Sequence, residues 1–333
     1  MKKFINKPEN VVSEMLEGLL TAHSDLLKSV ENNPKNLARK DAPVQDKVAI
    51  VSGGGSGHLP LFLGYIGKGM LDGVAVGEIF ASPSSKQIFD ITKEVNSGKG
   101  VLYLYGNYGG DVMNFDMASE MAEMEDIETA TVIGTDDVAS MPKGQENQRR
   151  GVAGLFYLYK LAGAKAEEGA SLEEVAEVAK RANQSVRTMG VGLSPCILPE
   201  VGKPSFTIEE GQMEIGMGIH GEPGYYKGEI QTADEVAETI VSNISSDLAL
   251  EAGNEVSVLV NGLGATPLEE QYIIFRKVSN IFQEKNITID KVYIGEYATS
   301  MEMAGLSISV LKLDDELKRL LNTPYTTPFH VQV

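Results

Sequence analysis

Two of the four histidines in this chain end glycine-rich turns, Gly53-Gly-Gly-Ser-Gly-His58 and Gly216-Met-Gly-Ile-His220. Glycine lets a backbone adopt positive φ and approach a small ligand closely, so a histidine that ends such a turn is expected to be presented rather than packed. Histidine also exchanges protons near neutral pH, which is what acid–base and nucleophilic catalysis use. His58 and His220 are therefore candidate functional residues. We interpret the other two histidines as structural or surface residues, namely His23 and His330.

Asp111 is a third candidate, because it follows Gly109-Gly110 shortly after the apolar segment 100–105. A carboxylate at the end of a buried strand can be partly desolvated and act as a general base. The same position would also suit the N-cap of a helix. The sequence leaves both interpretations of Asp111 open.

The glycine run before His58 has some features of a phosphate-binding loop, since such loops bind anions at helix N-termini. No Lys-Ser or Lys-Thr pair follows it, as it would in a P-loop, and its spacing is not that of the dinucleotide fingerprint. The pattern therefore argues against a bound nucleotide. Its backbone amides could still hold the oxygens of a small polyol-like ligand.

Strands alternate with helices in the first part of the chain. Apolar runs predict strands at residues 47–51, 73–76, 100–105 and 129–133. Helices are expected over residues 8–30, from residue 59, over 84–95, from residue 111, and over 151–168 and 171–189. This order is typical of a mostly parallel α/β sheet, whose ligands bind at the carboxyl ends of the strands. The loops that carry His58, Ser82 and Asp111 should therefore lie at one edge of one sheet.

Glycine and proline become frequent after residue 190. The alternating stretch 206–220 predicts a hairpin that ends at His220. Helices at 233–250, 268–285 and from residue 314 alternate with strands at 256–260, 291–294 and 307–312. We therefore expect an α/β domain with the glycine loops at residues 1–190, and an α+β two-layer domain that carries His220 at residues 191–333.

Composition excludes several classes of function. The chain has 29 Lys and Arg against 47 Asp and Glu, and its net charge of −18 repels nucleic-acid phosphates and anionic lipid. The single Cys196 cannot form an internal disulfide, and no apolar run approaches the roughly 20 residues that span a bilayer. We expect a cytoplasmic protein that binds neither nucleic acid nor membrane. Asp136-Asp137 and Arg149-Arg150 are interpreted as solvated loop charges that could also meet a partner protein.

Three loops together resemble the dihydroxyacetone-binding subunit of dihydroxyacetone kinases. They are Gly53-Gly-Gly-Ser-Gly-His58, Asn107-Tyr-Gly-Gly-Asp-Val-Met-Asn-Phe115 and Gly216-Met-Gly-Ile-His-Gly-Glu-Pro-Gly224. Shorter matches extend the resemblance over nearly the whole chain, namely Gly151-Val-Ala-Gly154, Leu193-Ser-Pro-Cys196, Val260-Asn-Gly-Leu-Gly264 and Gly295-Glu-Tyr297. Three loops in the same order are far more specific than one glycine loop.

The resemblance implies that a ring nitrogen of His220 adds to the ketone of dihydroxyacetone and forms a hemiaminal, a bond that glycerol cannot make. It implies that His58 hydrogen-bonds the ligand, that Asp111 deprotonates the hydroxyl that accepts phosphate, and that Gly55 and Ser82 contact the ligand. In the phosphotransferase-type kinases an ADP-carrying partner subunit supplies the phosphate. This chain would then need no nucleotide, metal or other cofactor of its own. The resemblance also implies a homodimer.

Three residues depart from the family pattern. The kinases carry Lys directly before Asn-Tyr-Thr-Gly-Asp and Glu directly after Gly-Ser-Gly-His. This chain has Gly106 and Leu59 at those places, and Gly109 in place of the threonine. A lysine there would offset the negative charge that develops during phosphoryl transfer, a contribution worth several kcal/mol.

Keeping the ligand-binding residues while losing a transfer residue is what a sensor needs. The family includes non-catalytic relatives that bind dihydroxyacetone and co-activate a TetR-type transcription regulator. We therefore favour a sensor of this kind. The alternative is the substrate-binding subunit of a phosphotransferase-dependent dihydroxyacetone kinase, and only Gly106, Leu59 and Gly109 separate the two.

Overall fold

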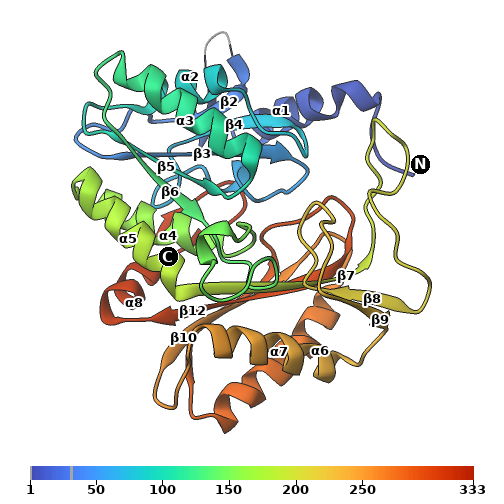
Figure 1. The fold of residues 1–333 in the computed structure, drawn as a ribbon. Helices are drawn as coiled ribbons and strands as arrows, with labels where there is room; N and C mark the ends of the chain where they lie inside the picture. Colours follow the sequence, from blue (N-terminus) through green and yellow to red (C-terminus); the bar gives the residue numbers. More distant parts are fainter. Residues whose placement is uncertain (1, 31–32) are drawn as a thin grey trace. The chain divides into compact units, whose positions relative to one another are not determined.

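The structure is a computed structural model that describes residues 2–30 and 33–333. It divides into two compact units, each drawn from separate segments of the chain (Figure 1). The first comprises Met1–Gly134, Tyr157–Arg181 and Arg319–Val333, and the second comprises Thr135–Phe156 and Ala182–Lys318. The domain boundary near residue 190 stays a prediction, and residue 190 lies within strand β7 (Val186–Ser194).

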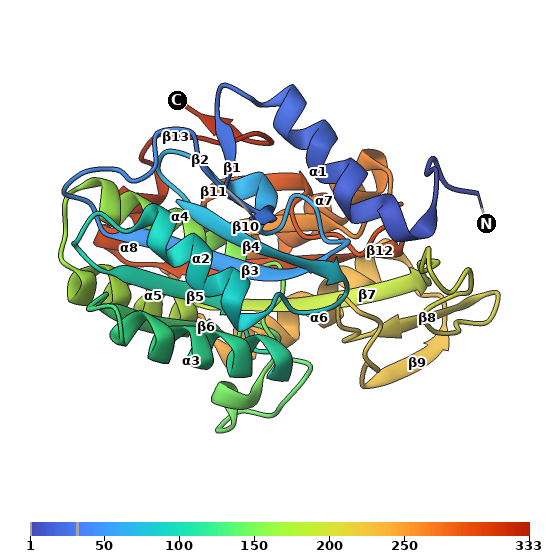
Figure 2. The ribbon, with the colours of Figure 1, turned by 90° about the horizontal axis from the view of Figure 1, so that it is seen from above.

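A six-stranded sheet forms the centre of the first unit, with the strand order β1-β2-β4-β3-β5-β6 (Figure 2). The strands are β1 (Leu27–Val30), β2 (Asn33–Arg39), β3 (Ala49–Ser56), β4 (Gly73–Ile79), β5 (Val101–Gly106) and β6 (Thr129–Gly134). β4, β3, β5 and β6 run parallel, whereas β1 and β2 pair antiparallel beside them. The carboxyl ends of the four parallel strands therefore share one edge of the sheet, which is where ligands bind in such sheets.

Helices pack on both faces of this sheet. α2 (Ser85–Val95) and α3 (Gly109–Glu123) share a core with Tyr103 and Tyr105 of β5. On the other face lies α4 (Leu155–Glu167), where the hydroxyls of Tyr159 and Ser52 share a hydrogen bond of 2.9 Å. The other elements of this unit are η1 (Pro8–Asn10), α1 (Val11–Ala22), η2 (Leu63–Tyr65), β13 (Tyr325–Thr326) and β14 (Val331–Gln332). The helices α5 (Leu172–Ser185) and α8 (Asp315–Leu321) have residues in both units.

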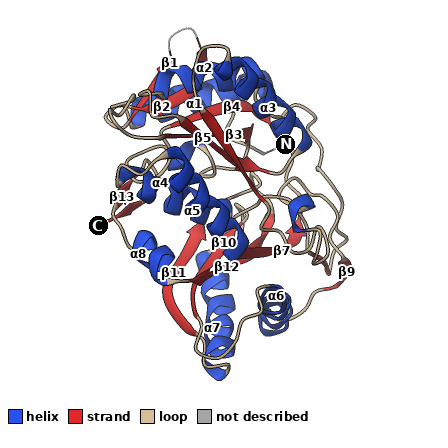
Figure 3. Cartoon of the chain, turned by 60° about the vertical axis from the view of Figure 1, so that its left-hand side comes forward, coloured by secondary structure: helices blue, strands red, loops and turns tan. Residues whose placement is uncertain are grey.

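The second unit holds a mixed sheet with the strand order β11-β10-β12-β7-β8-β9. Besides β7, its strands are β8 (Gln212–Ile215), β9 (Tyr226–Glu229), β10 (Glu255–Gly262), β11 (Thr288–Glu296) and β12 (Ala304–Leu313). Only β10 and β11 pair in parallel. α6 (Ala233–Asp247) and α7 (Leu268–Glu284) pack on one face and share its apolar core (Figure 3), while η3 (Glu146–Gln148) lies in a loop. The α/β sheet and the α+β two-layer unit confirm the predicted fold class.

Two helix predictions in the first unit were wrong. The helix expected over residues 8–30 ends at Ala22, because His23 leaves the helical conformation and residues 27–30 pair with β2 as β1. The helix expected from Leu59 does not form. Pro60 removes a backbone donor there, and the segment contains only the single turn η2.

Two further predictions were wrong near the start of the second sheet. The helix expected to reach residue 189 ends at Ser185, where β7 begins and pairs with β12. The hairpin expected within residues 206–220 has one strand there, β8, and its second strand is β9, which comes after His220. No helix within residues 2–30 and 33–333 has the length and apolar character needed to cross a membrane.

Three of the four charged residues predicted to be solvated are buried and Arg150 is partly buried, so that prediction was also wrong. Asp136, Asp137 and Arg149 expose 0%, 2% and 1% of their surface. Arg149 forms a two-pronged ion pair with Asp247, with Nη1–Oδ1 at 2.9 Å and Nη2–Oδ2 at 2.7 Å, and Arg187 donates to the same carboxylate. A buried charge is costly unless it is paired, and Asp247 supplies that pairing for Arg149 and Arg187.

Asp247→Asn tests the importance of this pairing. Burial alone would raise the pKa of Asp247, but the hydrogen bonds and charges of Arg149 and Arg187 hold it at about 2. Neutralising the carboxylate should therefore lower the free energy of unfolding by about 3 kcal/mol at pH 7. The difference from wild type should shrink below pH about 4, where the unfolded carboxyl group protonates, and be lost near pH 2.

Urea unfolding at several pH values measures this difference. Glu269→Gln, which neutralises an exposed carboxylate on α7, is the matched control and should have little effect. A loss for Asp247→Asn no larger than that of the control would show that the two guanidinium groups do not need this carboxylate.

Candidate functional site

Most of the glycine run before His58 belongs to strand β3 and packs tightly, so the prediction that the whole run forms a turn was wrong. A Cβ added to Gly54 would lie 2.3 Å from the ring of Phe62, and one added to Gly55 would lie 2.7 Å from the backbone nitrogen of Ala81. Gly57 alone in the run has positive φ, at 106°, and turns the chain toward His58. The chain's own packing therefore requires Gly54 and Gly55.

His58 is held between aromatic rings and exposes only 2% of its surface. Its ring stacks on Phe80 with the centroids 4.8 Å apart and an interplanar angle of 15°, and it meets Phe62 edge-on at 6.5 Å. The turn therefore does not present His58 outward as expected. Instead, packing fixes the orientation of the imidazole, which is what a directed hydrogen bond to a ligand requires.

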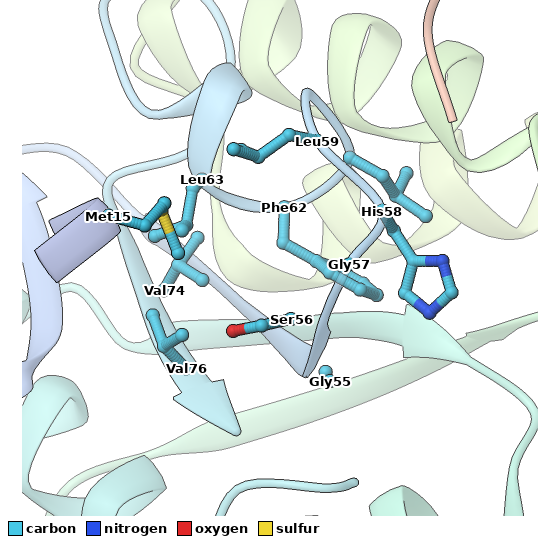
Figure 4. Close-up of a pocket in the computed structure, with 12 residues that line it drawn as sticks. Met15, Gly55, Ser56, Gly57, His58, Leu59, Phe62, Leu63, Val74 and Val76 are labelled. Carbon is cyan, nitrogen blue, oxygen red and sulfur yellow. The ribbon is translucent and has the colours of Figure 1, made fainter. Parts of the chain in front are cut away.

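A small void lies behind this turn (Figure 4). It offers about 10 Å³, enough for about one water molecule, and Leu59, Val74 and Val76 are among the residues that line it. The imidazole of His58 points away from Val74 and Val76 in this view. This void is therefore too small for a ketone, and Leu59, at the position where the family pattern has Glu, packs against it.

The loops after β3, β4 and β5 meet at one edge of the first sheet, as the sequence predicted. The hydroxyl oxygen of Ser82 lies 2.7 Å from the position that a Cβ on Gly110 would occupy. Gly55 packs on the backbone of Phe80 and Ala81, the two residues before Ser82. The ring of Phe80 stacks on the ring of His58. The structure thus brings Gly55, His58, Ser82 and the start of α3, which includes Asp111, into one neighbourhood.

Asp111 is the third residue of α3 and is 6% exposed. The N-cap of this helix is Tyr108, so the N-cap interpretation of Asp111 was wrong. Its carboxylate lies where the helix dipole favours negative charge. Burial, and then the charges of Asp116 and Asp111, raise the pKa of Tyr105 well above its usual range. The start of α3 is therefore a buried, negative environment in which a carboxylate can accept a ligand hydroxyl proton.

His220 belongs to the second unit and lies in the loop between β8 and β9. Its Nδ1 is 2.9 Å from Oε1 of Glu222, and its backbone N–H donates to Oε2 of Glu222 at 3.0 Å. Burial alone would raise the pKa of Glu222, but its hydrogen bond with the ring of His220 and the charge of Arg150 lower it to about 2. Glu222 is therefore a carboxylate that only accepts hydrogen bonds, so Nδ1 must donate.

This hydrogen bond fixes the tautomer of His220. In the neutral ring, a proton on Nδ1 leaves the lone pair on Nε2, which is then the nucleophilic atom. Sequence reasoning noted Glu222 only as part of a motif and did not assign it a role. The usable signal was its spacing of two residues from His220 in the turn Gly221-Glu-Pro-Gly224.

Two departures from the family pattern can be placed on β5 and α3. Gly109 is the first residue of α3, and a Cβ there would meet nothing within 4 Å, so a threonine would fit. Gly106 is the last residue of β5 and pairs with Gly134 of β6. The structure leaves open space for the Cβ of a side chain at residue 109, whereas Gly106 places no cation at the end of β5. In the parts that the structure describes, no group of three or more His, Cys, Asp or Glu side chains is placed to bind a metal.

Comparison with known proteins identifies the family. The Dak1 domain matches residues 17–329, and the chain belongs to this family. It is 46% identical over 329 residues to the dihydroxyacetone-binding subunit of a phosphotransferase-dependent dihydroxyacetone kinase from Listeria innocua, covering 99% of both chains.

Two solved structures share the fold over nearly the whole chain. The dihydroxyacetone kinase of C. freundii matches with a TM-score of 0.91 and 31% identity, over 99% of this chain and 60% of that one. A dihydroxyacetone kinase operon co-activator matches with a TM-score of 0.89 and 31% identity, over 96% of this chain and 98% of that one. The expected family resemblance is therefore confirmed.

Gly55→Ala tests whether close packing builds the first-unit site. The added methyl group would lie within 3 Å of the backbone of Phe80 and Ala81, so we expect it to lower the free energy of unfolding by about 1–3 kcal/mol. Gly109→Ala is the matched control, because its methyl group enters open space beside the same site. Thermal unfolding of both variants gives the comparison, and equal stability would contradict the packing account.

Proposed function

We propose that this chain is the substrate-binding subunit of a phosphotransferase-dependent dihydroxyacetone kinase, and that His220 holds the ketone covalently. The observation that carries the proposal is its 46% identity, over 99% of both chains, to a relative named as such a subunit. The hydrogen bond between Nδ1 of His220 and Glu222, which leaves Nε2 as the nucleophilic atom, supports the covalent step.

Hemiaminal formation uses groups that the chain supplies. Nε2 of His220 forms a bond to the carbonyl carbon, and the π electrons of the C=O bond move to its oxygen. That oxygen takes up one proton and Nδ1 releases one, so the neutral adduct forms without net proton uptake. Glu222, beside Nδ1, stabilises the positive charge that develops on the ring meanwhile. Glycerol has no carbonyl group and cannot be held in this way.

The other candidate residues have the roles that the family resemblance implies. We propose that His58 hydrogen-bonds it, that Gly55 and Ser82 contact it, and that Asp111 takes the proton from the hydroxyl that receives phosphate. An ADP-carrying partner subunit would supply that phosphate, which agrees with the missing nucleotide-binding signatures. Homodimerisation, which the resemblance implies, stays a prediction.

The co-activator hypothesis, favoured from the sequence alone, is the less well supported of the two. It rests on Gly106 and on the likeness to the solved co-activator, which is 31% identical. The solved C. freundii kinase is equally similar, and the relative at 46% identity is a kinase subunit. A TetR-type regulator would become the favoured partner only if the chain binds the ketone but does not support turnover.

Loss of His220 should remove ketone binding. We expect the wild-type chain to bind dihydroxyacetone and to bind glycerol far more weakly. The substitution His220→Ala should reduce the affinity for dihydroxyacetone by about 100-fold, equivalent to about 2.8 kcal/mol. Isothermal titration calorimetry measures the affinity of the wild-type chain for each ligand and that of His220→Ala for dihydroxyacetone. His23→Ala, which removes a histidine of the first unit outside the site, is the control. Unchanged affinity in His220→Ala would refute covalent capture.

Turnover separates the kinase from the co-activator. With the ADP-carrying subunit and the phosphorelay proteins present, we expect the wild-type chain to form dihydroxyacetone phosphate. Gly106→Lys should raise the rate by about 100-fold, the effect of one well-placed donor on a charged transition state. Gly109→Thr, the other family residue near it, should change the rate little because it enters open space. A wild-type chain that binds the ketone and forms no product would favour the co-activator.

A further inference from the structure

Arg150 lies in the second unit and is fixed there by both its backbone and its side chain. Its carbonyl oxygen accepts from the N–H of Asp137 at 3.1 Å, and its own N–H donates to the hydroxyl of Ser140 at 3.0 Å. Its guanidinium donates to Oδ2 of Asp137 through Nε at 2.9 Å, with Nη2 at 2.8 Å from the same oxygen. Asp137 is 2% exposed and also accepts from the N–H of Ala139. The guanidinium therefore has one well-defined position.

From that position Arg150 reaches the loop that carries His220. Nη2 donates to the carbonyl oxygen of Gly216 at 3.0 Å, at the residue where the chain leaves β8 with φ of 85°. Nη1 lies 3.9 Å from Oε2 of Glu222. Arg150 thus contacts the loop at its start and again at the carboxylate that pairs with His220.

Gly218 makes the second of these contacts sterically possible. A Cβ on Gly218 would lie 2.2 Å from Oε2 of Glu222 and 2.6 Å from Nη1 of Arg150. Any larger residue would therefore occupy the space in which the guanidinium approaches the carboxylate. The two oxygens of Glu222 have separate tasks, because Oε1 faces Nδ1 of His220 and Oε2 faces the backbone N–H of His220 and Arg150.

We propose that Arg150 is a positioning residue, which holds the carboxylate of Glu222 so that Nδ1 of His220 keeps its proton and Nε2 carries the nucleophilic lone pair. Partners of this kind act through the group they orient, and their loss commonly costs about 10-fold to 100-fold in affinity or activity where they orient a metal-binding histidine. The proposal rests on the proposed capture of a ketone by His220 for its functional meaning. Its structural content, the tautomer of His220, can be measured without any ligand.

The tautomer of His220 is the direct readout. The chain has only four histidines, so ¹⁵N-histidine labelling gives a spectrum that single substitutions can assign. In the wild-type chain we expect the neutral ring of His220 to carry its proton on Nδ1. In Arg150→Gln we expect a mixture of the two tautomers, and adduct formation with dihydroxyacetone about tenfold slower. Arg276→Gln, which removes an exposed arginine ion pair on α7, should change neither.

Gly218→Ala provides a second variant that leaves Arg150 and Asp137 intact. Its methyl group separates the guanidinium from Glu222, so the tautomer of His220 should shift as it does in Arg150→Gln. Gly18→Ala, whose methyl group meets nothing within 4 Å, is the matched glycine control. Arg150→Lys should recover part of the wild-type behaviour, since it keeps the charge but cannot contact both Asp137 and Gly216 in the same way.

The outcomes separate this inference from the proposed function. An unchanged tautomer in Arg150→Gln and Gly218→Ala overturns the positioning role, even where the adduct forms more slowly. Arg150 would then serve only to build the loop. A wild-type chain with the expected tautomer and no adduct would count against ketone capture and leave the role of Arg150 standing.

Discussion

The ion pair between Asp137 and Arg150 is the contact on which the His220 loop depends. It fixes a guanidinium that contacts Gly216 and approaches Glu222, and Glu222 in turn pairs with Nδ1 of His220. Burial raises the pKa of Asp137 to about 6, against the lowering effect of Arg150, so its negative charge is retained at neutral pH at some cost. A charge that stays ionised in an apolar setting forms strong, directed hydrogen bonds. These hydrogen bonds fix the position of Arg150, which in turn contacts the loop that carries His220.

In the first unit, order comes from close packing instead. Gly54 and Gly55 let Phe62 and the Phe80–Ala81 backbone approach β3, and the two phenylalanine rings then hold His58. The parallel strands bring this packing to the same sheet edge as Ser82 and the start of α3. A histidine fixed by rings and a carboxylate at a helix start are suited to orienting a small polar ligand and accepting its proton.

Periodicity in the sequence predicted the regular elements of the first sheet, and prediction failed where tertiary contacts decide. The parallel strands were predicted from apolar runs and α2 from the sequence over 84–95, whereas β1 and the end of α5 depend on pairing with other strands. The candidates His58 and Asp111 were proposed from their glycine-rich loops, whereas Gly55 and Ser82 were proposed only from the family resemblance. The burial of Asp136, Asp137 and Arg149 could not be predicted, because the groups that pair with them lie 10 or more residues away in the sequence. The role proposed for Arg150 could not be predicted either, because its contacts with Gly216 and Glu222 join residues far apart in the sequence.

The central claim is that His220 bonds to the ketone carbon, and ¹³C NMR of dihydroxyacetone labelled at its carbonyl carbon tests this most directly. We predict that the wild-type chain converts the bound carbonyl signal into that of a tetrahedral carbon attached to nitrogen, and that the His220→Ala chain does not. A bound ligand that keeps its carbonyl signal in the wild-type chain would contradict the account.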